Sequence, residues 1–182
     1  MRIRKIPNLL INKEDLEISQ FGDGEKFSVK RAEVSAKIDA SKLGYDVVRL
    51  APGKRSRPFH AHYVIEEAFF MLAGHGTLRH GDKSHPVREG DFICAPPDPN
   101  QPHQIINTSN EELTYIAMST NESIDICSYP DSDKFGVWHT QSKDSSDSRN
   151  FMSFRVKQAV STMRMASSIN SPNENSFTLP AD

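Results

Sequence analysis

The central part of the chain alternates between short apolar runs and groups of turn-forming residues. The apolar runs occupy residues 45–50, 60–73, 77–80, 85–89, 91–95, 103–106 and 113–119. Glycine, proline, asparagine and aspartate fill most of the segments between them. Short apolar runs with this spacing are typical of antiparallel strands in a sandwich or barrel. Gly81-Asp82 predicts a hairpin turn, since glycine supplies the positive φ that such turns require. The pattern therefore predicts an all-β domain.

The two ends of the chain are less regular than this central part. Residues 1–33 alternate weakly, and we expect an N-terminal arm or extra strands that could pair with a second subunit. Residues 34–138 should form the barrel. The C-terminal segment, 139–182, begins with a polar linker rich in serine and aspartate that extends to residue 150. A short helix at 151–166 and a disordered tail are expected after it.

Length, charge and cysteine content limit the classes of function. The 182 residues fit one domain, and 22 basic residues nearly balance 24 acidic ones, for a net charge of -2. This balance gives no overall attraction to nucleic acid or anionic lipid, so neither is expected as a partner. No run approaches the ~18 apolar residues of a membrane span, and the N-terminal apolar stretch is too short for a signal peptide.

The two cysteines, Cys94 and Cys127, do not form a disulfide framework and indicate reduced thiols. With no export signal, a cytoplasmic protein is expected. Cys94 lies within the apolar run 91–95 and is expected to be buried.

Candidate metal ligands gather in two of the apolar runs. His60 and His62 are two residues apart, so in an extended strand both side chains point to the same face. Glu67 follows five residues after His62, and a turn or bulge must re-aim it, which leaves Glu66 as a competing ligand. His103 opens another run and would bring a fourth ligand from a neighbouring strand. Imidazole and carboxylate together suit a divalent first-row cation.

The desolvation of polar groups favours the metal interpretation for this set. Two imidazoles and a carboxylate that face one barrel interior would be costly to bury without a shared partner. The remaining histidines are expected to be surface or hydrogen-bonded residues. They are His75, His80, His85 and His139.

The first of these runs resembles the first motif of the cupin superfamily. That motif is a glycine, five residues, His-x-His, three or four residues, Glu, six residues and Gly. Here Gly53, His60, His62, Glu67 and Gly74 occur in this order, with six residues rather than five between Gly53 and His60.

The second cupin motif is Gly, five residues, Pro-x-Gly, two residues, His, three residues and Asn. Gly90, Pro96, His103 and Asn107 occur in this order, with Asp98 in place of the middle glycine and two extra residues before His103. The resemblance covers residues 40–138 or so. It implies a jelly-roll barrel, known as the double-stranded β-helix, with one divalent ion held by His60, His62, Glu67 and His103; Asn107 would be a neighbour of His103.

The segment 126–139 resembles one found after the barrel in single-domain cupins described as sugar-phosphate isomerases. This resemblance implies a metal-dependent enzyme that polarises a carbonyl of a small oxygenated substrate. Glu66 is the candidate base. The candidate phosphate-binding residues are Lys54, Arg55 and Arg57, on the loop before His60.

Two other functions are compatible with the same residues. One is an iron-dependent oxygenase, because the sequence does not select among manganese, iron, zinc and nickel. The other is a non-catalytic module that binds a sugar or another small molecule. The apolar residues 69–72 would line a ligand pocket or, more simply, form barrel core. Edge strands of small barrels are commonly covered by a partner, so a homodimer is expected.

Overall fold

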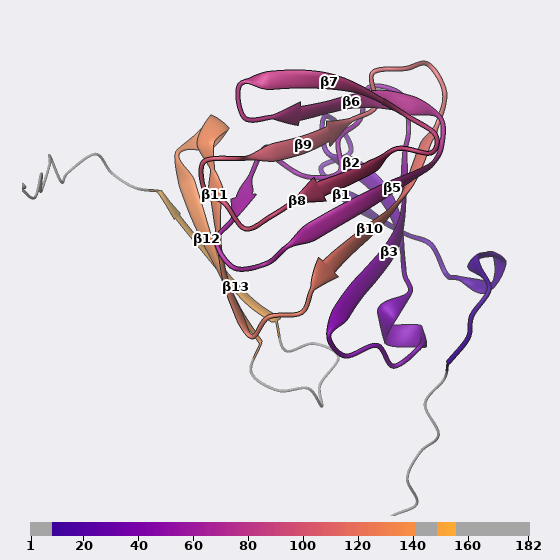
Figure 1. Cartoon of the computed structure of the whole chain (residues 1–182), viewed down its shortest axis with the longest axis horizontal. Coiled ribbons are helices and arrows are strands. Elements are labelled where there is room, and N and C mark those ends of the chain that lie inside the picture. The colour runs from indigo at the N-terminus through magenta and orange to yellow at the C-terminus, as the bar shows by residue number, and fades with distance from the viewer. Residues whose placement is uncertain (1–8, 141–148, 156–182) are drawn as a thin grey trace, which may run out of the picture.

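The computed structural model describes residues 9–140 and 149–155, and strands make up most of this part of the chain (Figure 1). The strands are Ser19–Gly22 (β1), Ser28–Glu33 (β2), Leu43–Leu50 (β3), Ala61–His62 (β4), Glu67–Ala73 (β5), His75–His80 (β6), Lys83–Arg88 (β7), Phe92–Ala95 (β8), His103–Ile106 (β9), Leu113–Thr120 (β10), Ile124–Tyr129 (β11), Lys134–Thr140 (β12) and Arg149–Arg155 (β13). Short 3-10 helices occupy Lys13–Asp15 (η1), Ser35–Lys37 (η2) and Pro130–Ser132 (η3).

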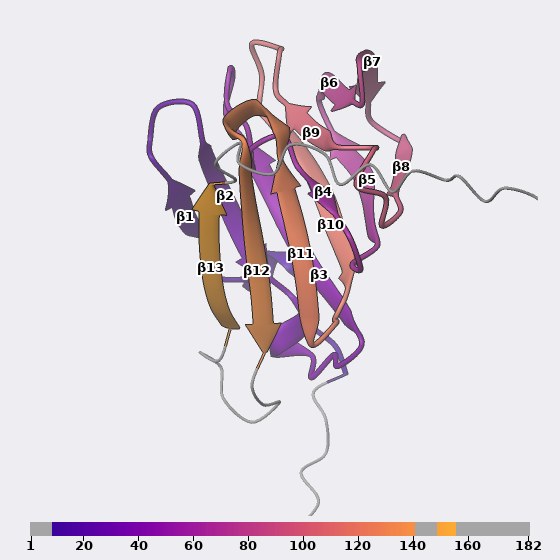
Figure 2. The ribbon, with the colours of Figure 1, turned by 90° about the vertical axis from the view of Figure 1, so that its left-hand side faces the viewer.

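The strands form sheets of six, four and three members within these residues. The six-stranded sheet has the order β1-β2-β3-β10-β5-β8, the four-stranded sheet β13-β12-β11-β4, and the three-stranded sheet β7-β6-β9. Strands within each sheet pair in the antiparallel sense. Figure 2 faces the four-stranded sheet, in which β11, β12 and β13 lie side by side. The all-β prediction is confirmed.

The hydrophobic core lies between the six-stranded and three-stranded sheets. Phe69 and Met71 on β5 point inward and are buried, whereas Phe70, between them, packs outside on Phe92 with ring centroids 4.3 Å apart. Phe69 meets Tyr115 of β10 edge to face at 6.0 Å. Each side chain buried in this way contributes on the order of 1.5–3 kcal/mol through removal of apolar surface from water. The interpretation of Phe69 and Met71 as barrel core is confirmed.

The hairpin predicted at Gly81-Asp82 joins β6 to β7. His80 pairs with Lys83 across the turn, and Gly81 has a φ of 56°. A residue with a side chain would be strained there, because positive φ brings Cβ close to the backbone.

The N-terminal segment adds strands to the sheet of its own chain. β1 pairs with β2, and β2 continues the six-stranded sheet by pairing with β3, where Glu33 lies opposite Asp46. Both edges of β2 are therefore paired within its own chain, so its backbone hydrogen bonds do not require the expected second subunit. This position brings side chains of β2 into the barrel, where they matter for the cavity described below.

At the other end, the helix expected over residues 151–166 is wrong for its first part. Residues 149–155 form strand β13, which pairs with β12 and sets Phe154 opposite Phe135. The spacing of the aromatic residues is compatible with a helix, but pairing with an available sheet edge decides the conformation. Residues 156–166 lie outside the described residues, as does most of the linker expected at 139–150.

The expected burial of Cys94 is also wrong. Alternation along β8 turns Ala95 inward, so Cys94 faces out and is exposed. Cys127 is buried, and both thiols are free, as predicted. No helix within residues 9–140 and 149–155 is both long enough and apolar enough to span a membrane.

Candidate metal centre

Three imidazoles and one carboxylate meet where β4, β5 and β9 come together. The Nε2 atoms of His60, His62 and His103 lie 3.7, 3.3 and 2.9 Å from the same oxygen, Oε2 of Glu67. His60 and His103 are buried, and the side chains of His62 and Glu67 are 12% and 20% exposed. The structure thus brings together the four residues predicted as metal ligands.

Backbone pairing explains how the histidines converge. His60 and His62 flank Ala61, so both point to one side of the extended segment that ends in β4. The N–H of His60 donates to the carbonyl of His103 at 3.2 Å, and the N–H of His103 donates back at 2.7 Å. This reciprocal pair fixes β9 beside β4 and places the third imidazole next to the other two.

Glu67 reaches the cluster from another sheet. The chain bends after His62 and re-enters strand conformation at Glu67, the first residue of β5 in the six-stranded sheet. The expected change of direction between His62 and Glu67 is therefore present. It comes from a break between two strands rather than from a bulge within one.

The outer nitrogens of two imidazoles are held by oxygen acceptors. His60 Nδ1 lies 2.8 Å from the carbonyl of Pro58, and His62 Nδ1 lies 2.6 Å from Oδ2 of Asp125. Because a carbonyl or carboxylate oxygen can only accept, each Nδ1 must carry the hydrogen. In the neutral rings the lone pair is then on Nε2, the atom that faces Glu67. Such outer contacts commonly orient metal-binding histidines.

Asp125 is the site residue that the sequence analysis missed. It is 1% exposed, and its Oδ1 accepts the N–H groups of Val64 and Ile65 at 3.0 and 3.3 Å. The alternation of apolar and polar residues along β11 was the available signal, but it predicts the opposite orientation, with the isoleucines buried and Asp125 exposed. Ile124 and Ile126 face outward, at 54% and 36% exposed, while the polar residue between them points into the barrel.

The pKa values of His60 and His62 shift in opposite directions. Burial lowers the pKa of His60 to about 3, so this ring is neutral. Burial also opposes charge on His62, but its hydrogen bonds with Asp125 and Cys127 and the nearby carboxylate of Glu67 raise its pKa to about 12. Burial would favour protonation of Glu67, but its hydrogen bond with His103 and the adjacent imidazoles of His62 and His60 hold its pKa well below the ordinary value.

The donor set fits a divalent cation. His62 Nε2 is buried and makes no hydrogen bond within the described part of the chain, although Oε2 of Glu67 lies 3.3 Å away. Ligand atoms of His60, His62 and Glu67 all lie within 4.8 Å of one another. An orphaned imidazole nitrogen aimed at a carboxylate and two further imidazoles is the arrangement that a first-row metal ion would satisfy.

Glu66, the candidate base, lies outside this cluster. It is exposed, and its Oε1 accepts a long hydrogen bond from the thiol of Cys94 at 3.8 Å. Because Glu66 immediately precedes Glu67 at the start of β5, the two side chains leave the backbone in opposite directions. The structure does not bring Glu66 to the face on which the histidines lie.

The three candidate phosphate-binding residues also differ in their position relative to the cluster. The ammonium group of Lys54 donates to the carbonyls of Gly24 and Glu25 in the β1–β2 turn. Arg55 joins two segments through backbone bridges to Phe27 and Ile106. The side chain of Lys54 is therefore engaged away from the cluster, whereas for Arg55 these contacts involve only the backbone.

Arg57 is the exposed member of this group, and its charge reaches two tyrosines near the cluster. Burial raises the pKa of Tyr115 and of Tyr129, and the guanidinium of Arg57 acts against the rise in both. Tyr129 stacks on the ring of His60, with centroids 6.1 Å apart. Arg57 is therefore the cation of this loop that lies within electrostatic reach of the site.

Asn107 has a different role from the one expected. Its Nδ2 donates to the carbonyls of Leu50 and Glu111 at 2.7 and 2.6 Å, and its Oδ1 accepts from the backbone and hydroxyl of Ser109. These hydrogen bonds use the amide to hold the β9–β10 loop. Asn107 supports the barrel and does not orient His103.

Comparison with known proteins finds a family match over part of this barrel. Residues 46–119 match the cupin domain family. Over 71 residues the chain is 34% identical to an uncharacterised protein of Methanocaldococcus jannaschii and 32% identical to an oxalate-binding protein of Thermotoga maritima. Each match covers 39% of this chain, and 48% and 56% of the relatives. The chain thus spans about half the length of the curated relatives it matches.

Solved structures extend the likeness to most of the chain. A sugar phosphate isomerase of the cupin superfamily from Silicibacter pomeroyi superposes with a TM-score of 0.69 at 21% identity, covering 85% of this chain and 97% of the other. A proposed sugar phosphate isomerase from Acidithiobacillus ferrooxidans gives 0.65 at 22% identity, covering 80% and 92%. At these identities the likeness shows the fold. The fold is the cupin jelly roll, and the match to the cupin domain family lies within residues 46–119.

Proposed function

We propose that this cupin is a metal-dependent enzyme that acts on a small oxygenated metabolite, with sugar-phosphate isomerisation as the leading reaction. The observation that carries the proposal is the convergence of three Nε2 atoms on Oε2 of Glu67, in a protein whose fold matches two sugar-phosphate-isomerase-type cupins. His60, His62, Glu67 and His103 would hold one divalent ion, either manganese, iron, zinc or nickel. Such an ion supplies Lewis acidity toward a carbonyl or hydroxyl oxygen.

The remaining roles belong to side chains of this chain. Asp125 holds one hydrogen of His62 on Nδ1, so that Nε2 is the nitrogen that would lose its proton and become a ligand when an ion binds. Glu33 and Asp46 line a cavity beside Glu67 and are better placed than Glu66 to exchange a proton with a ligand there. Arg57 is the preferred cation for a phosphate among the three named earlier, since it is exposed and its charge reaches the two tyrosines near the cluster, whereas the ammonium of Lys54 is bound to backbone carbonyls.

Metal analysis tests the first part of this proposal. The protein is purified without chelators, and its metal content is compared with that of a His60→Ala, His62→Ala double variant and a Glu66→Gln control. We expect about one ion per chain in the wild type and control, and a large loss in the double variant. Equal metal content in all three proteins would reject the site.

Conversion of sugar phosphates tests the reaction. The metal-loaded protein is incubated with triose, pentose and hexose phosphates, and aldose–ketose interconversion is followed by NMR. Interconversion that stops in the double variant would support the isomerase. Turnover by the double variant at the wild-type rate would contradict it.

A non-catalytic ligand-binding module is the second candidate, and one observation favours it. The curated relative from Thermotoga maritima is described as an oxalate-binding protein and is 32% identical over 71 residues. Binding of a sugar phosphate or oxalate without turnover would identify this function. An iron-dependent oxygenase, the third function compatible with the ligands, predicts oxygen uptake by the iron-loaded protein with a bound substrate.

We also propose that the protein is a homodimer with no nucleic acid or membrane partner. The outer face of the four-stranded sheet exposes apolar side chains on β11 and β13, including Ile124, Met152 and Phe154. Exposed apolar groups beside an edge strand are typical of a surface covered by a partner. Light scattering should give twice the mass of the chain, and a monomer at micromolar concentration would contradict the proposal. The cytoplasmic location stays a prediction.

A further inference from the structure

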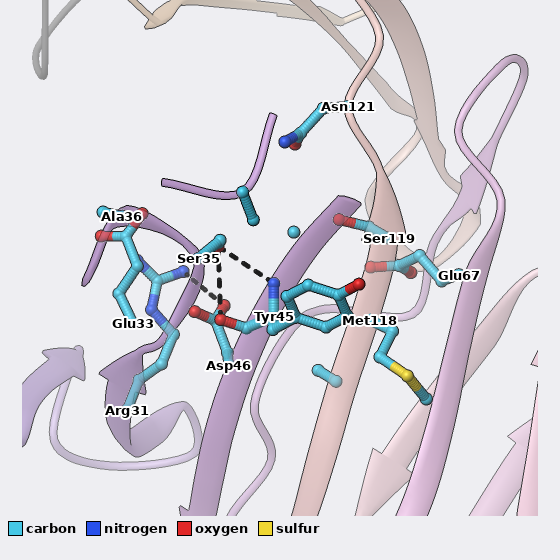
Figure 3. Close-up of a pocket in the computed structure, with 13 residues that line it drawn as sticks. Arg31, Glu33, Ser35, Ala36, Tyr45, Asp46, Glu67, Met118, Ser119 and Asn121 are labelled. Atoms are coloured by element: carbon cyan, nitrogen blue, oxygen red, sulfur yellow. Dashed lines mark hydrogen bonds and ion pairs between the residues drawn. The ribbon is translucent and has the colours of Figure 1, made fainter. Parts of the chain in front are cut away.

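A polar cavity of about 220 Å³ is lined by residues of β2, β3, β5 and β10 (Figure 3). Glu67 forms part of its wall, so the cavity and the candidate ligand cluster share a side chain. Charged and hydroxyl or amide groups dominate the rest of the lining. The residues that matter below are Arg31, Glu33, Asp46, Ser119 and Asn121.

Strand register explains why these side chains share one face. Glu67 pairs with Ser119, and Ser119 pairs on its other side with Gly44. Directly paired residues of antiparallel strands point to the same face of the sheet. A Cβ on Gly44 would lie 2.7 Å from Oγ of Ser119, so the absence of a side chain at Gly44 keeps this part of the cavity open.

The far wall comes from β2, which precedes the residues matched by the cupin domain family. Glu33 pairs with Asp46, which would set two like charges opposite each other. Arg31 is two residues before Glu33 and thus on the same face, and its Nη1 lies 3.4 Å from Oδ2 of Asp46. The result is a guanidinium placed among carboxylates on a partly exposed wall.

This lining distinguishes among ligand chemistries. A guanidinium only donates hydrogen bonds and a carboxylate only accepts them, whereas a ligand hydroxyl does both. A small dianion in this cavity would be repelled by the carboxylates of Glu33, Asp46 and Glu67. Among the described residues of the lining, the only cation, Arg31, is already paired with Asp46. The hydroxyl groups of a polyol can donate to the carboxylates and accept from the guanidinium. The lining therefore favours neutral hydroxyl groups over phosphate or carboxylate.

We propose that this cavity binds the neutral, hydroxyl-rich part of a sugar, with Arg31 and Asp46 as specificity-determining residues. The proposal rests on the proposed function, because the same ligand would direct an oxygen toward the ion held at Glu67. A phosphate on the ligand would then lie outside this cavity, on the side of Arg57. The segment before the family match thus supplies part of the ligand site.

Calorimetric titration of the metal-loaded protein tests the assignment. The probes are neutral sugars of three to six carbons, such as D-fructose, and oxalate as a small dianion without hydroxyls. Arg31→Met should weaken sugar binding by roughly tenfold or more, since it removes hydrogen bonds from a charged donor. Ser119→Ala should weaken sugar binding to a smaller extent and keeps the assay informative if Arg31→Met fails to fold. Arg49→Met is the matched control, because Arg49 lies on the opposite face of β3.

The outcomes separate this inference from the proposed function. Weaker sugar binding in both cavity variants, with metal content and oxalate binding unchanged, supports the cavity assignment. Equal sugar binding in the wild type and both variants overturns it, as does the absence of binding to every neutral sugar by the metal-loaded wild type. A wild type that takes up no metal instead rejects the metal centre itself.

Discussion

Asp125→Asn tests whether the metal centre depends on a residue outside the cupin motifs. The substitution keeps the shape of the side chain, and its carbonyl oxygen can still accept from the backbone N–H groups of Val64 and Ile65. The other end changes from an acceptor to a donor. An amide N–H would then face the Nδ1–H of His62 across 2.6 Å. Two donors cannot share that position, so His62 must move its hydrogen to Nε2 or rotate.

The size of the effect follows from the loss of that tautomer. A ring protonated at Nε2 has no lone pair for the ion, and loss of an outer partner of this kind typically weakens metal affinity about 10–100-fold. This corresponds to roughly 1.4–2.8 kcal/mol of binding free energy. The variant should remain folded, because both backbone hydrogen bonds to residue 125 persist and the volume of the side chain is unchanged.

Competition with a chromophoric chelator measures the zinc affinity of the wild type, Asp125→Asn and Glu66→Gln at neutral pH. Glu66→Gln is the matched control, since it neutralises an exposed carboxylate one residue from Glu67 without a contact to the cluster. Circular dichroism and the melting temperature check that each variant folds. A folded Asp125→Asn variant with wild-type zinc affinity would refute the reasoning.

Three further predictions concern stability and accessibility. Asn107→Ala leaves the buried carbonyl of Leu50 and the more exposed carbonyl of Glu111 without their donor, so urea unfolding should show a loss of roughly 1–3 kcal/mol, and unchanged stability would contradict the structural role. Gly74→Ala should lower the melting temperature by several degrees, because φ is 82° and the new Cβ would lie 2.5 Å from the carbonyl oxygen of Glu112. Cys94 should react with a thiol reagent in the native protein and Cys127 only after unfolding, so two fast thiols would argue against this burial.

The ligand positions could be predicted because their information is local. The two-residue spacing of His60 and His62 gives a shared face whatever the rest of the fold, and the motif spacings add Glu67 and His103. The structure brings these four together, and their role as ligands stays a prediction that metal analysis can test. The choice between Glu66 and Glu67 depended on where the strand restarts, and the structure begins β5 at Glu67.

The position of Asp125 could not be predicted locally, because it depends on the register between strands that are distant in the sequence. Asp125 reaches His62 only because β11 pairs with β4, which sets Cys127 opposite His62 across 65 positions of the chain. Local hydropathy suggests that Ile124 and Ile126 point inward. In the structure they point outward, and Asp125 is buried in its pair with His62. A strand shifted by one residue exchanges its two faces, so only the pairing partner could settle the orientation.

Metal binding and ligand selectivity depend on different parts of this barrel. The candidate ligands come from β5, β9 and the segment that ends in β4, within the residues that match the cupin domain family, whereas Arg31 and Glu33 come from β2, outside that match. A change at Arg31 alters the donors that face a ligand but leaves every contact of the imidazoles in place. A change at Asp125 alters the tautomer of His62 but leaves the wall of the cavity in place. Sugar binding and metal affinity should therefore respond to different substitutions, and a variant of either residue that changes both equally would show that the two sites are one.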